Sequence, residues 1–276
     1  MENLTEKAYR LRQHALEIVM AGGGGHIGGD MSVMDILVTL YFDQMNVSPE
    51  RPNDPDRDLF VLSKGHAMEA YYAVLAEKGF LSYEKVLAGY LKFGSPLIGH
   101  PNNHLPGIEM NSGSLGHGLP VCVGMALAAR MDARPSRVYV VMGDGELAEG
   151  SVWEGAMAAG HYHLDNLCAV VDRNRLQISG CTEDVMAQDS QQARWTSFGW
   201  HVVTVDGHDI PRLHDAFEEA KHTKGAPTIV IAETVKGRGS PLMENKPEWH
   251  HHLPTAEEYQ IIRGDLTAHR EATFHE

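Results

Sequence analysis

Four short runs rich in valine and isoleucine in the second half of the chain are typical of buried β-strands. They lie at residues 138–142, 167–171, 201–205 and 228–232. Strands that are covered on both faces read as nearly continuous apolar runs, whereas half-exposed strands alternate. Helical stretches at residues 151–161 and 210–221 lie between these runs. The pattern therefore predicts parallel strands joined by helices, with helices on both faces of the sheet.

The first half of the chain predicts further helices and one more strand. Apolar residues recur close to the 3.6-residue helical period over residues 4–20, and the glycines at 22–25 end that helix. Further predicted elements are helices at 32–42 and 67–78 and a strand at 59–62. Residues 92–120 show little periodicity, and a loop of this length in a compact domain is usually functional. We expect residues 1–276 to form a single α/β domain with a C-terminal extension from about residue 237.

Composition excludes several classes of partner. The 276 residues include 23 Lys and Arg and 37 Asp and Glu, so the formal net charge is −14. This acidic balance argues against nucleic acid or an anionic membrane as the main partner. The sequence shows neither a transmembrane helix nor a secretory signal. Cys122, Cys168 and Cys181 form no C-x-x-C pair, which excludes a disulfide framework and fits a cytoplasmic protein.

Polar residues follow two neighbouring predicted strands directly. Gly143-Asp144-Gly145 follows one strand, and Asn174 follows the next strand along the chain. Ligands of such sheets bind at the carboxyl ends of the strands. A carboxylate and a carboxamide there can share a hard cation such as Mg²⁺, which often retains phosphate oxygens as ligands. The glycines let a diphosphate approach the backbone closely, although the tripeptide taken alone also fits a plain Asp-Gly turn.

These residues resemble the thiamine diphosphate and metal motif, and residues 143–180 resemble the transketolase form of it in particular. Further matching motifs occur in the family's order. They are Gly25-His26, Leu62-Ser63-Lys64-Gly65-His66, Gly99-His100-Pro101, Gly113-Ser114-Leu115-Gly116-His117-Gly118 and Thr234-Val235-Lys236-Gly237-Arg238-Gly239. The resemblance runs from about residue 5 to 260, which makes it far more specific than a single glycine-rich signature.

The resemblance implies the thiamine-diphosphate-binding fold and a transferase activity. In this family a two-carbon ketol unit moves from a ketose or ketose phosphate to an aldose or aldose phosphate. Thiamine diphosphate would carry out the difficult chemistry, as cofactors generally do. Mg²⁺, or Ca²⁺ or Mn²⁺ in its place, would hold the diphosphate. Substrates would therefore be sugar phosphates, whose identity the sequence does not reveal.

The resemblance also assigns roles residue by residue. The metal ligands would be Asp144, Asn174 and the backbone carbonyl of Leu176. The catalytic histidines would be His26, His66, His100 and His250. The residues implied to bind the cofactor are His66, Gly113, Ser114, Leu115, Gly143, Asp144, Gly145, Glu146, Glu149, Asn174 and His250.

Some of these assignments have alternatives. His251 competes with His250 for the position that faces the cofactor. Glu149 and Glu154 match carboxylates that link two cofactor sites across a dimer. Ser151 and Glu154 also fit the S-x-x-E pattern of a helix capping box, which would explain Glu154 without a functional role.

This sequence departs from full transketolases in two respects. The usual Ser-Gly-His-Pro-Gly reads Gly24-Gly25-His26-Ile27-Gly28, and His117 stands where Gln is common, which affects substrate preference more than cofactor binding. The chain also matches only the first of three domains. The resemblance therefore implies the N-terminal subunit of a split transketolase. A second polypeptide would carry the pyrimidine-binding and third domains, and two copies of each would assemble.

Two other functions are open at this point. One is a subunit of a different thiamine-dependent synthase, and the other is a non-catalytic cofactor-binding or regulatory module. The intact Asp144 and Asn174, together with the histidines, favour an active enzyme.

Overall fold

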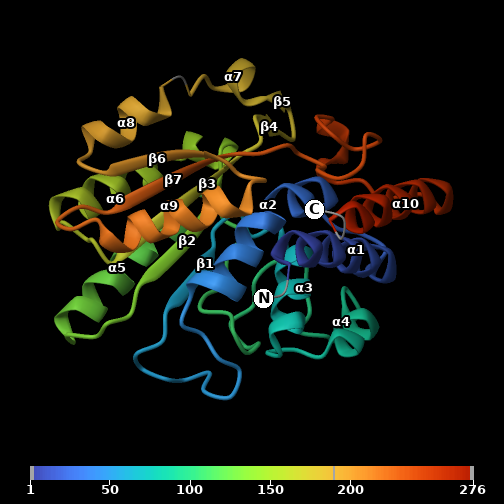
Figure 1. Ribbon diagram of the computed structural model, residues 1–276, viewed down its shortest axis with the longest axis horizontal. Coiled ribbons are helices and arrows are strands. Elements are labelled where there is room, and N and C mark those ends of the chain that lie inside the picture. Colours follow the sequence, from blue (N-terminus) through green and yellow to red (C-terminus); the bar gives the residue numbers. More distant parts are fainter. Residues whose placement is uncertain (1–2, 189, 274–276) are drawn as a thin grey trace.

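In the computed structural model, which describes residues 3–188 and 190–273, five strands form one parallel sheet (Figure 1). Their order is β1-β2-β3-β7-β6, and every neighbouring pair is parallel. The strands are β1 (Leu59–Leu62), β2 (Val138–Gly143), β3 (Leu167–Arg173), β6 (His201–Asp206) and β7 (Thr228–Glu233). All five strands predicted from the sequence are confirmed, and four of them extend one or two residues further.

Helices cover both faces of this sheet (Figure 1). They are α1 (Leu4–Gly22), α2 (Ile27–Thr39), α3 (Met68–Lys78), α4 (Tyr83–Gly89), α5 (Gly118–Met131), α6 (Gly150–His161), α7 (Thr182–Val185), α8 (Gln191–Ser197), α9 (Ile210–His222) and α10 (Ala256–Ala272). Short 3₁₀ turns are Gly145–Ala148 and Pro247–His250, and a small antiparallel hairpin joins β4 (Leu176–Gln177) to β5 (Gly180–Cys181). None of the helices in this described part of the chain has both the length and the apolar character of a membrane span.

Two cores lie on opposite sides of the sheet because successive strand side chains point in opposite directions. Tyr139 and Val141 of β2 pack in one core with residues of α1, α2, α3 and α9. Val138 and Val140 of the same strand pack in the other with residues of α5 and α6. Both faces of β2 are therefore buried, which explains why its sequence is continuously apolar.

Several element boundaries differ from the sequence prediction. Helix α2 begins at Ile27 rather than at residue 32. The sequence pattern does not predict its first turn because that turn contains Gly28 and Gly29, which are poor helix formers but are buried here. Its predicted end is a π-helical turn at Leu40–Gln44. The predicted loop 92–120 ends at His117, where the unpredicted helix α5 begins. Pro120 lies in the first turn of α5, where a missing backbone N–H costs nothing.

The C-terminal segment returns to the start of the chain. Ile262 and Leu266 of α10 pack against Tyr9 and Leu16 of α1, and the two helices lie side by side in Figure 1. Thr255 and Glu258 cap α10 reciprocally. This docking carries the segment between β7 and α10 across the carboxyl end of the sheet.

The capping box proposed for Ser151 and Glu154 is wrong. Glu149 occupies the N-cap position of α6 and makes no side-chain capping hydrogen bond. The Ser151 hydroxyl instead donates to the carbonyl oxygen of Gly116 at 3.0 Å, and so ties α6 to the glycine-rich loop. The Glu154 side chain lies exposed on α6.

Candidate active site

The carboxyl ends of four strands meet at one cavity of about 460 Å³. Lys64 follows β1, Asp144 follows β2, Asn174 follows β3 and Lys236 follows β7. Thirteen residues predicted from the sequence line this cavity, and they are His26, His66, His100, Gly113, Leu115, Gly143, Asp144, Gly145, Glu146, Glu149, Asn174, Leu176 and His250. Ser114 is exposed and does not line the cavity, and neither does Glu154.

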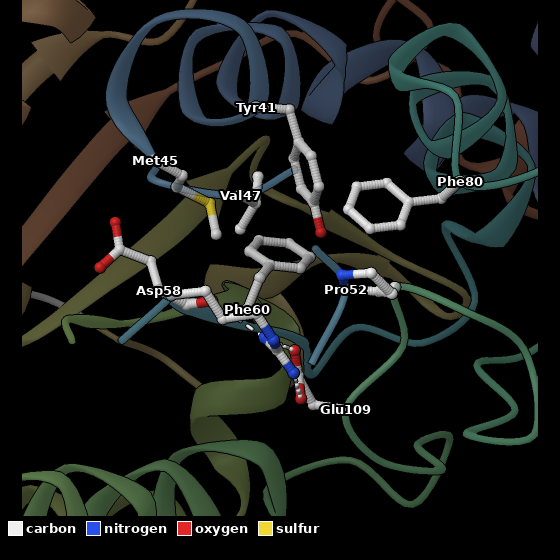
Figure 2. Close-up of a pocket in the computed structure, with 10 residues that line it drawn as sticks. Tyr41, Met45, Val47, Pro52, Asp58, Phe60, Phe80 and Glu109 are labelled. Atoms are coloured by element: carbon white, nitrogen blue, oxygen red, sulfur yellow. Dashed lines mark hydrogen bonds and ion pairs between the residues drawn. The ribbon is translucent and has the colours of Figure 1, made fainter. Parts of the chain in front are cut away.

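A second hollow, at the amino end of β1, lacks room for a ligand. Its volume is about 10 Å³, which is space for roughly one water molecule. Figure 2 shows Tyr41, Phe60 and Phe80 turned toward one another there. The Arg57 guanidinium donates two hydrogen bonds to the Glu109 carboxylate beside them. Aromatic packing and this ion pair close the hollow, so we regard it as structural.

Three residues that can offer an oxygen to a cation line the cavity of about 460 Å³. The oxygens belong to the Asp144 carboxylate, the Asn174 carboxamide and the Leu176 backbone carbonyl. Asp144 is 2% exposed, and its carboxylate accepts hydrogen bonds from the backbone N–H of Gly145 (2.8 Å) and of Arg175 (2.5 Å). The Asn174 carboxamide oxygen accepts from the N–H of Leu176 at 3.1 Å. Burial, followed by the charge of Asp172, raises the pKa of Asp144 to about 6. A bound cation would remove this cost of burying a carboxylate.

This donor set fits a cation held jointly with a phosphate. Within residues 3–188 and 190–273, no three His, Cys, Asp or Glu side chains are grouped to hold a metal on their own. One carboxylate, one carboxamide and one backbone carbonyl leave several of the six positions of Mg²⁺ to other oxygens. A diphosphate would supply those oxygens and a compensating negative charge.

The predicted histidines form one cluster around His26. The centre of its ring lies 5.5 Å from that of His66, 5.9 Å from His100, 5.6 Å from His250 and 4.8 Å from His251. His250 lines the cavity, whereas His251 is exposed at its edge. The geometry therefore favours His250 for contact with a ligand and leaves His251 within reach of His26.

Burial lowers the pKa of the four histidines that line the cavity. Burial, followed by neighbouring histidines and lysines, lowers the pKa of His26 to about 4, and burial followed by Lys236 lowers the pKa of His250 to about 3. Burial also lowers the pKa of His66 and of His100. Near pH 7 these imidazoles are neutral, so each carries one donor and one acceptor. Such groups can bind hydroxyl and carbonyl oxygens, and the buried Nδ1 of His26 has no partner within the described structure.

Two lysines to which the sequence pattern assigns no role line the same cavity. The Lys236 ammonium donates to Nδ1 of His250 at 2.8 Å and to the carbonyl oxygen of Leu176 at 3.4 Å. Burial, followed by the charge of Lys64, lowers the pKa of Lys236 to about 8, which leaves it mostly protonated at pH 7. Lys64 forms a buried ion pair with Asp172, at 2.5 Å. Lys236 is therefore the cation best placed to meet an anionic ligand. Its sequence signals are its place just after a strand and the family motif at residues 234–239, neither of which assigns it a role.

Glycines and a buried glutamate shape the wall of the cavity. Gly113 has a φ of +140°, and a Cβ there would lie 2.8 Å from the His100 ring, so no larger residue fits. The Glu146 carboxylate accepts hydrogen bonds from the Ser63 hydroxyl, from the N–H of Gly116 and from the N–H of Gly143. Glu146 thus joins three segments of the wall, whatever it contacts in a bound ligand.

A pair of buried carboxyl groups below His26 was not predicted. Asp30 and Glu69 are fully buried, and neither Oδ2 of Asp30 nor Oε2 of Glu69 has a hydrogen-bond partner within the described residues. Burial raises the pKa of each, and the charge of Glu69 raises the pKa of Asp30 further. Glu69 also accepts from the backbone N–H of His26 at 3.3 Å and from the Tyr90 hydroxyl. This pair fixes the backbone from which the His26 ring enters the cluster.

Comparison with known proteins places this site in a family. Residues 4–275 match the family described as transketolase, thiamine diphosphate binding domain. A protein of Phocaeicola vulgatus, named as one subunit of an apulose-4-phosphate transketolase, is 49% identical over 94% of this chain and 92% of its own length. A 6-deoxy-6-sulfo-D-fructose transketolase subunit of Clostridium sp. is 39% identical over 96% of both chains. Human transketolase is 42% identical over 95% of this chain but only 42% of its own length.

Solved structures agree with the sequence comparison. A transketolase of Campylobacter jejuni superposes with a TM-score of 0.90 at 27% identity, over 99% of this chain and 45% of that chain. A variant transketolase of Pichia stipitis superposes with a TM-score of 0.90 at 32% identity, over 96% of this chain and 41% of that chain. The chain thus spans less than half the length of these transketolases.

These matches cover nearly the whole chain, and the relatives of matching length are named as subunits. They confirm the predicted fold class, the predicted thiamine-diphosphate-binding fold and the predicted transketolase function. The chain belongs to the transketolase family, and residues 4–275 form its thiamine diphosphate binding domain.

Proposed function

We propose that the cavity holds the diphosphate of thiamine through a divalent cation, and that its histidines act on a sugar phosphate. The observation that carries this proposal is the convergence of Asp144, Asn174 and the Leu176 carbonyl with Lys236 on one cavity. Mg²⁺ is the cation we expect, with Ca²⁺ or Mn²⁺ as substitutes. The Lys236 ammonium would neutralise part of the remaining phosphate charge.

The protein's own contribution to the reaction is to bind, to orient and to move protons. When bound, thiamine diphosphate supplies the carbon that allows a C–C bond beside a carbonyl to break and form. His26, His66 and His100 would hydrogen-bond substrate hydroxyl and carbonyl oxygens as neutral imidazoles. Because the Lys236 ammonium donates to Nδ1 of His250, that ring carries its proton on Nε2 and presents it as a donor.

We propose that a separate polypeptide completes the active site. The relatives that match this chain over nearly their whole length are named as single subunits, whereas undivided transketolases are more than twice as long. The partner would supply the pyrimidine-binding and third domains, with two copies of each chain in a cytoplasmic enzyme. Residues 1–276 would act as one diphosphate-binding domain, whose extension from about residue 237 brings His250 to the site.

An activity assay tests this proposal. The full chain is mixed with its partner subunit, thiamine diphosphate and Mg²⁺, and offered ketose donors together with an aldose acceptor. Apulose 4-phosphate and 6-deoxy-6-sulfo-D-fructose come first, because they name the relatives at 49% and 39% identity. We expect ketol transfer only from the mixed subunits. Full activity of this chain alone would contradict the divided active site.

A further inference from the structure

A relay of buried polar groups lies behind the turn that carries Lys236. Val235, next to Lys236, donates its backbone N–H to Nε2 of His208 at 2.9 Å. Nδ1 of His208 lies 2.7 Å from Oδ2 of Asp35, and Asp35 forms a two-pronged ion pair with Arg12, at 3.1 and 2.5 Å. The relay therefore joins α1, α2, the loop after β6 and the loop after β7. The side chains of Arg12, Asp35 and His208 are 1%, 4% and 9% exposed.

The hydrogen bonds fix the protonation state of His208. Because the N–H of Val235 can only donate, Nε2 of His208 must be an unprotonated acceptor. Nδ1 then carries the ring proton and donates it to Asp35. Burial favours the neutral form of Asp35, but Arg12 and His208 together outweigh it and hold the pKa of Asp35 well below its usual range. Asp35 is thus a carboxylate that selects the accepting tautomer, as carboxylates do behind metal-bound histidines.

The bond from Val235 to His208 lies between the other anchors of the same turn. The N–H of Thr234 donates to the Arg173 carbonyl oxygen at 3.1 Å, and the N–H of Gly237 donates to the Gly28 carbonyl oxygen at 3.0 Å. Between these bonds, the backbone direction at Val235 sets where the Lys236 side chain starts. His208 itself lines a separate hollow and not the cavity that contains Lys236, so it does not contact a ligand in that cavity directly.

We propose that His208 is a positioning residue for the cofactor site. By accepting the N–H of Val235, it orients the backbone from which Lys236 reaches His250 and the cavity, and Asp35 with Arg12 keeps it in the accepting tautomer. This inference rests on the proposed role of Lys236 in binding the diphosphate of thiamine.

Two substitutions of His208 separate positioning from a structural role. In His208→Gln, the new amide oxygen lies roughly where Nε2 of His208 lies, so it still accepts the hydrogen bond from the N–H of Val235. In His208→Asn, the shorter side chain places its amide near the position of Nδ1, so it still donates to Asp35. It does not reach the N–H of Val235, which is left without an acceptor. Asp35→Asn is a third variant, which keeps the imidazole but removes the carboxylate that fixes its tautomer. His222→Asn, on the exposed end of α9, is the matched control.

Each variant is assembled with the partner subunit, and the Kd of thiamine diphosphate with Mg²⁺ is measured by calorimetry. We expect His208→Asn to raise this Kd about tenfold, or ~1.4 kcal/mol. We expect Asp35→Asn to raise it in the same direction, and His208→Gln and His222→Asn to remain close to the parent. In kinetic assays, His208→Asn should raise the KM for the cofactor and leave kcat at saturating cofactor near that of the parent. Urea unfolding should give similar stabilities for the Asn and Gln variants.

The variant Lys236→Met separates failure of this inference from failure of the proposed function. If His208 acts through Lys236, adding His208→Asn to Lys236→Met causes no further loss of cofactor affinity. Equal affinities in His208→Asn and His208→Gln, or a full additional loss in the double variant, would overturn the inference while Lys236 keeps its role. An unchanged Kd in Lys236→Met would instead overturn the proposed role of Lys236, and the inference with it.

Discussion

At the scale of single residues, Asp144 is the site residue whose chemical type matters most for the proposed cation. It is the only carboxylate among the three proposed cation ligands, and a hard divalent ion needs anionic oxygen. We predict that Asp144→Asn, assembled with the partner subunit, binds thiamine diphosphate with Mg²⁺ at least tenfold more weakly, which is about 1.4 kcal/mol. Calorimetry with Mg²⁺ and with a chelator measures this loss. Asp132→Asn, in an exposed ion pair, is the control, and parent-like affinity in Asp144→Asn would rule out the cation site.

The histidines should affect turnover rather than cofactor affinity. We predict that His66→Ala and His100→Ala lower kcat of the assembled enzyme by ~10²–10⁴-fold, the usual contribution of one positioned acid–base group. The Kd of thiamine diphosphate should change by only a few-fold. His104→Ala, in the exposed part of the same loop as His100, should match the parent. Weak cofactor binding together with normal kcat at saturating cofactor would reverse the assignment.

Sequence patterns reveal site residues only where they follow a local rule. Asp144 and Asn174 are predictable because they directly follow apolar strands, and the family resemblance adds the histidines. Lys236 follows the same rule, but nothing local shows that its side chain reaches His250. The carboxyl pair Asp30 and Glu69 has no signal in the sequence, because its two members come from different helices and meet only in the fold.

At the scale of elements, the packing of α6 depends on a glycine. A Cβ on Gly160 would lie 1.9 Å from the carbonyl oxygen of Phe198, and a backbone atom cannot move aside cheaply. We predict that Gly160→Ala lowers the free energy of unfolding by roughly 1–3 kcal/mol, as overpacking usually does. Urea unfolding of the full chain measures the change.

Gly264 in α10 is the matched control for this prediction. It also lies in a helix, but a Cβ there meets nothing within 4 Å. Gly264→Ala should therefore raise the free energy of unfolding by about 0.5–1 kcal/mol, through helix propensity alone. Equal effects of the two substitutions would contradict the proposed close contact of α6 with Phe198.

The sequence predicts strands better than helices in this fold for a physical reason. Strands buried on both faces, such as β2 and β3, are apolar at almost every position and have no polar interruptions. Helix α5 buries one face, but its exposed positions Val121, Gly124 and Ala128 are also apolar or small, so no stripe stands out in the sequence. Gly118 and Pro120 in its first turn also resemble a loop. The small hairpin β4–β5 has two-residue strands, too short for any periodicity to appear.

At the scale of the whole molecule, the buried histidines make folding sensitive to acid. The pKa of His26 is about 4 and that of His250 about 3 in the folded chain, against ~6.5 in an unfolded chain. Between pH 6.5 and 4 these two sites therefore bind more protons in the unfolded chain than in the folded chain. Their contribution to stability falls as the pH drops through this window, whereas Asp144, whose pKa is raised to about 6, contributes in the opposite direction.

We predict that the parent loses more of its free energy of unfolding between pH 7.5 and pH 5, measured by urea titration, than a variant without these two histidines. The double variant His26→Gln, His250→Gln should show a shallower dependence on pH. His104→Gln, on an exposed loop, should keep the slope of the parent. An identical slope in the parent and the double variant would show that these two histidines are not the groups that couple folding to pH.

The proposed division of the enzyme into two polypeptides also concerns the whole molecule, and local patterns do not reveal it. It rests on the relatives of matching length, which are named as subunits. The substrate is harder to predict from the sequence, since the relatives at 49% and 39% identity are named for different sugars.

Binding of the cation and the diphosphate in one cavity, at the carboxyl ends of β2 and β3, underlies the whole proposed function. The most direct test is a crystal structure of this chain, assembled with its partner subunit, with thiamine diphosphate and Mn²⁺ and with anomalous diffraction from the manganese. We predict one manganese peak within coordination distance of the Asp144 carboxylate, the Asn174 carboxamide oxygen and the Leu176 carbonyl oxygen, with the diphosphate beside Lys236. A bound cofactor whose manganese lies away from Asp144 and Asn174 would contradict this assignment.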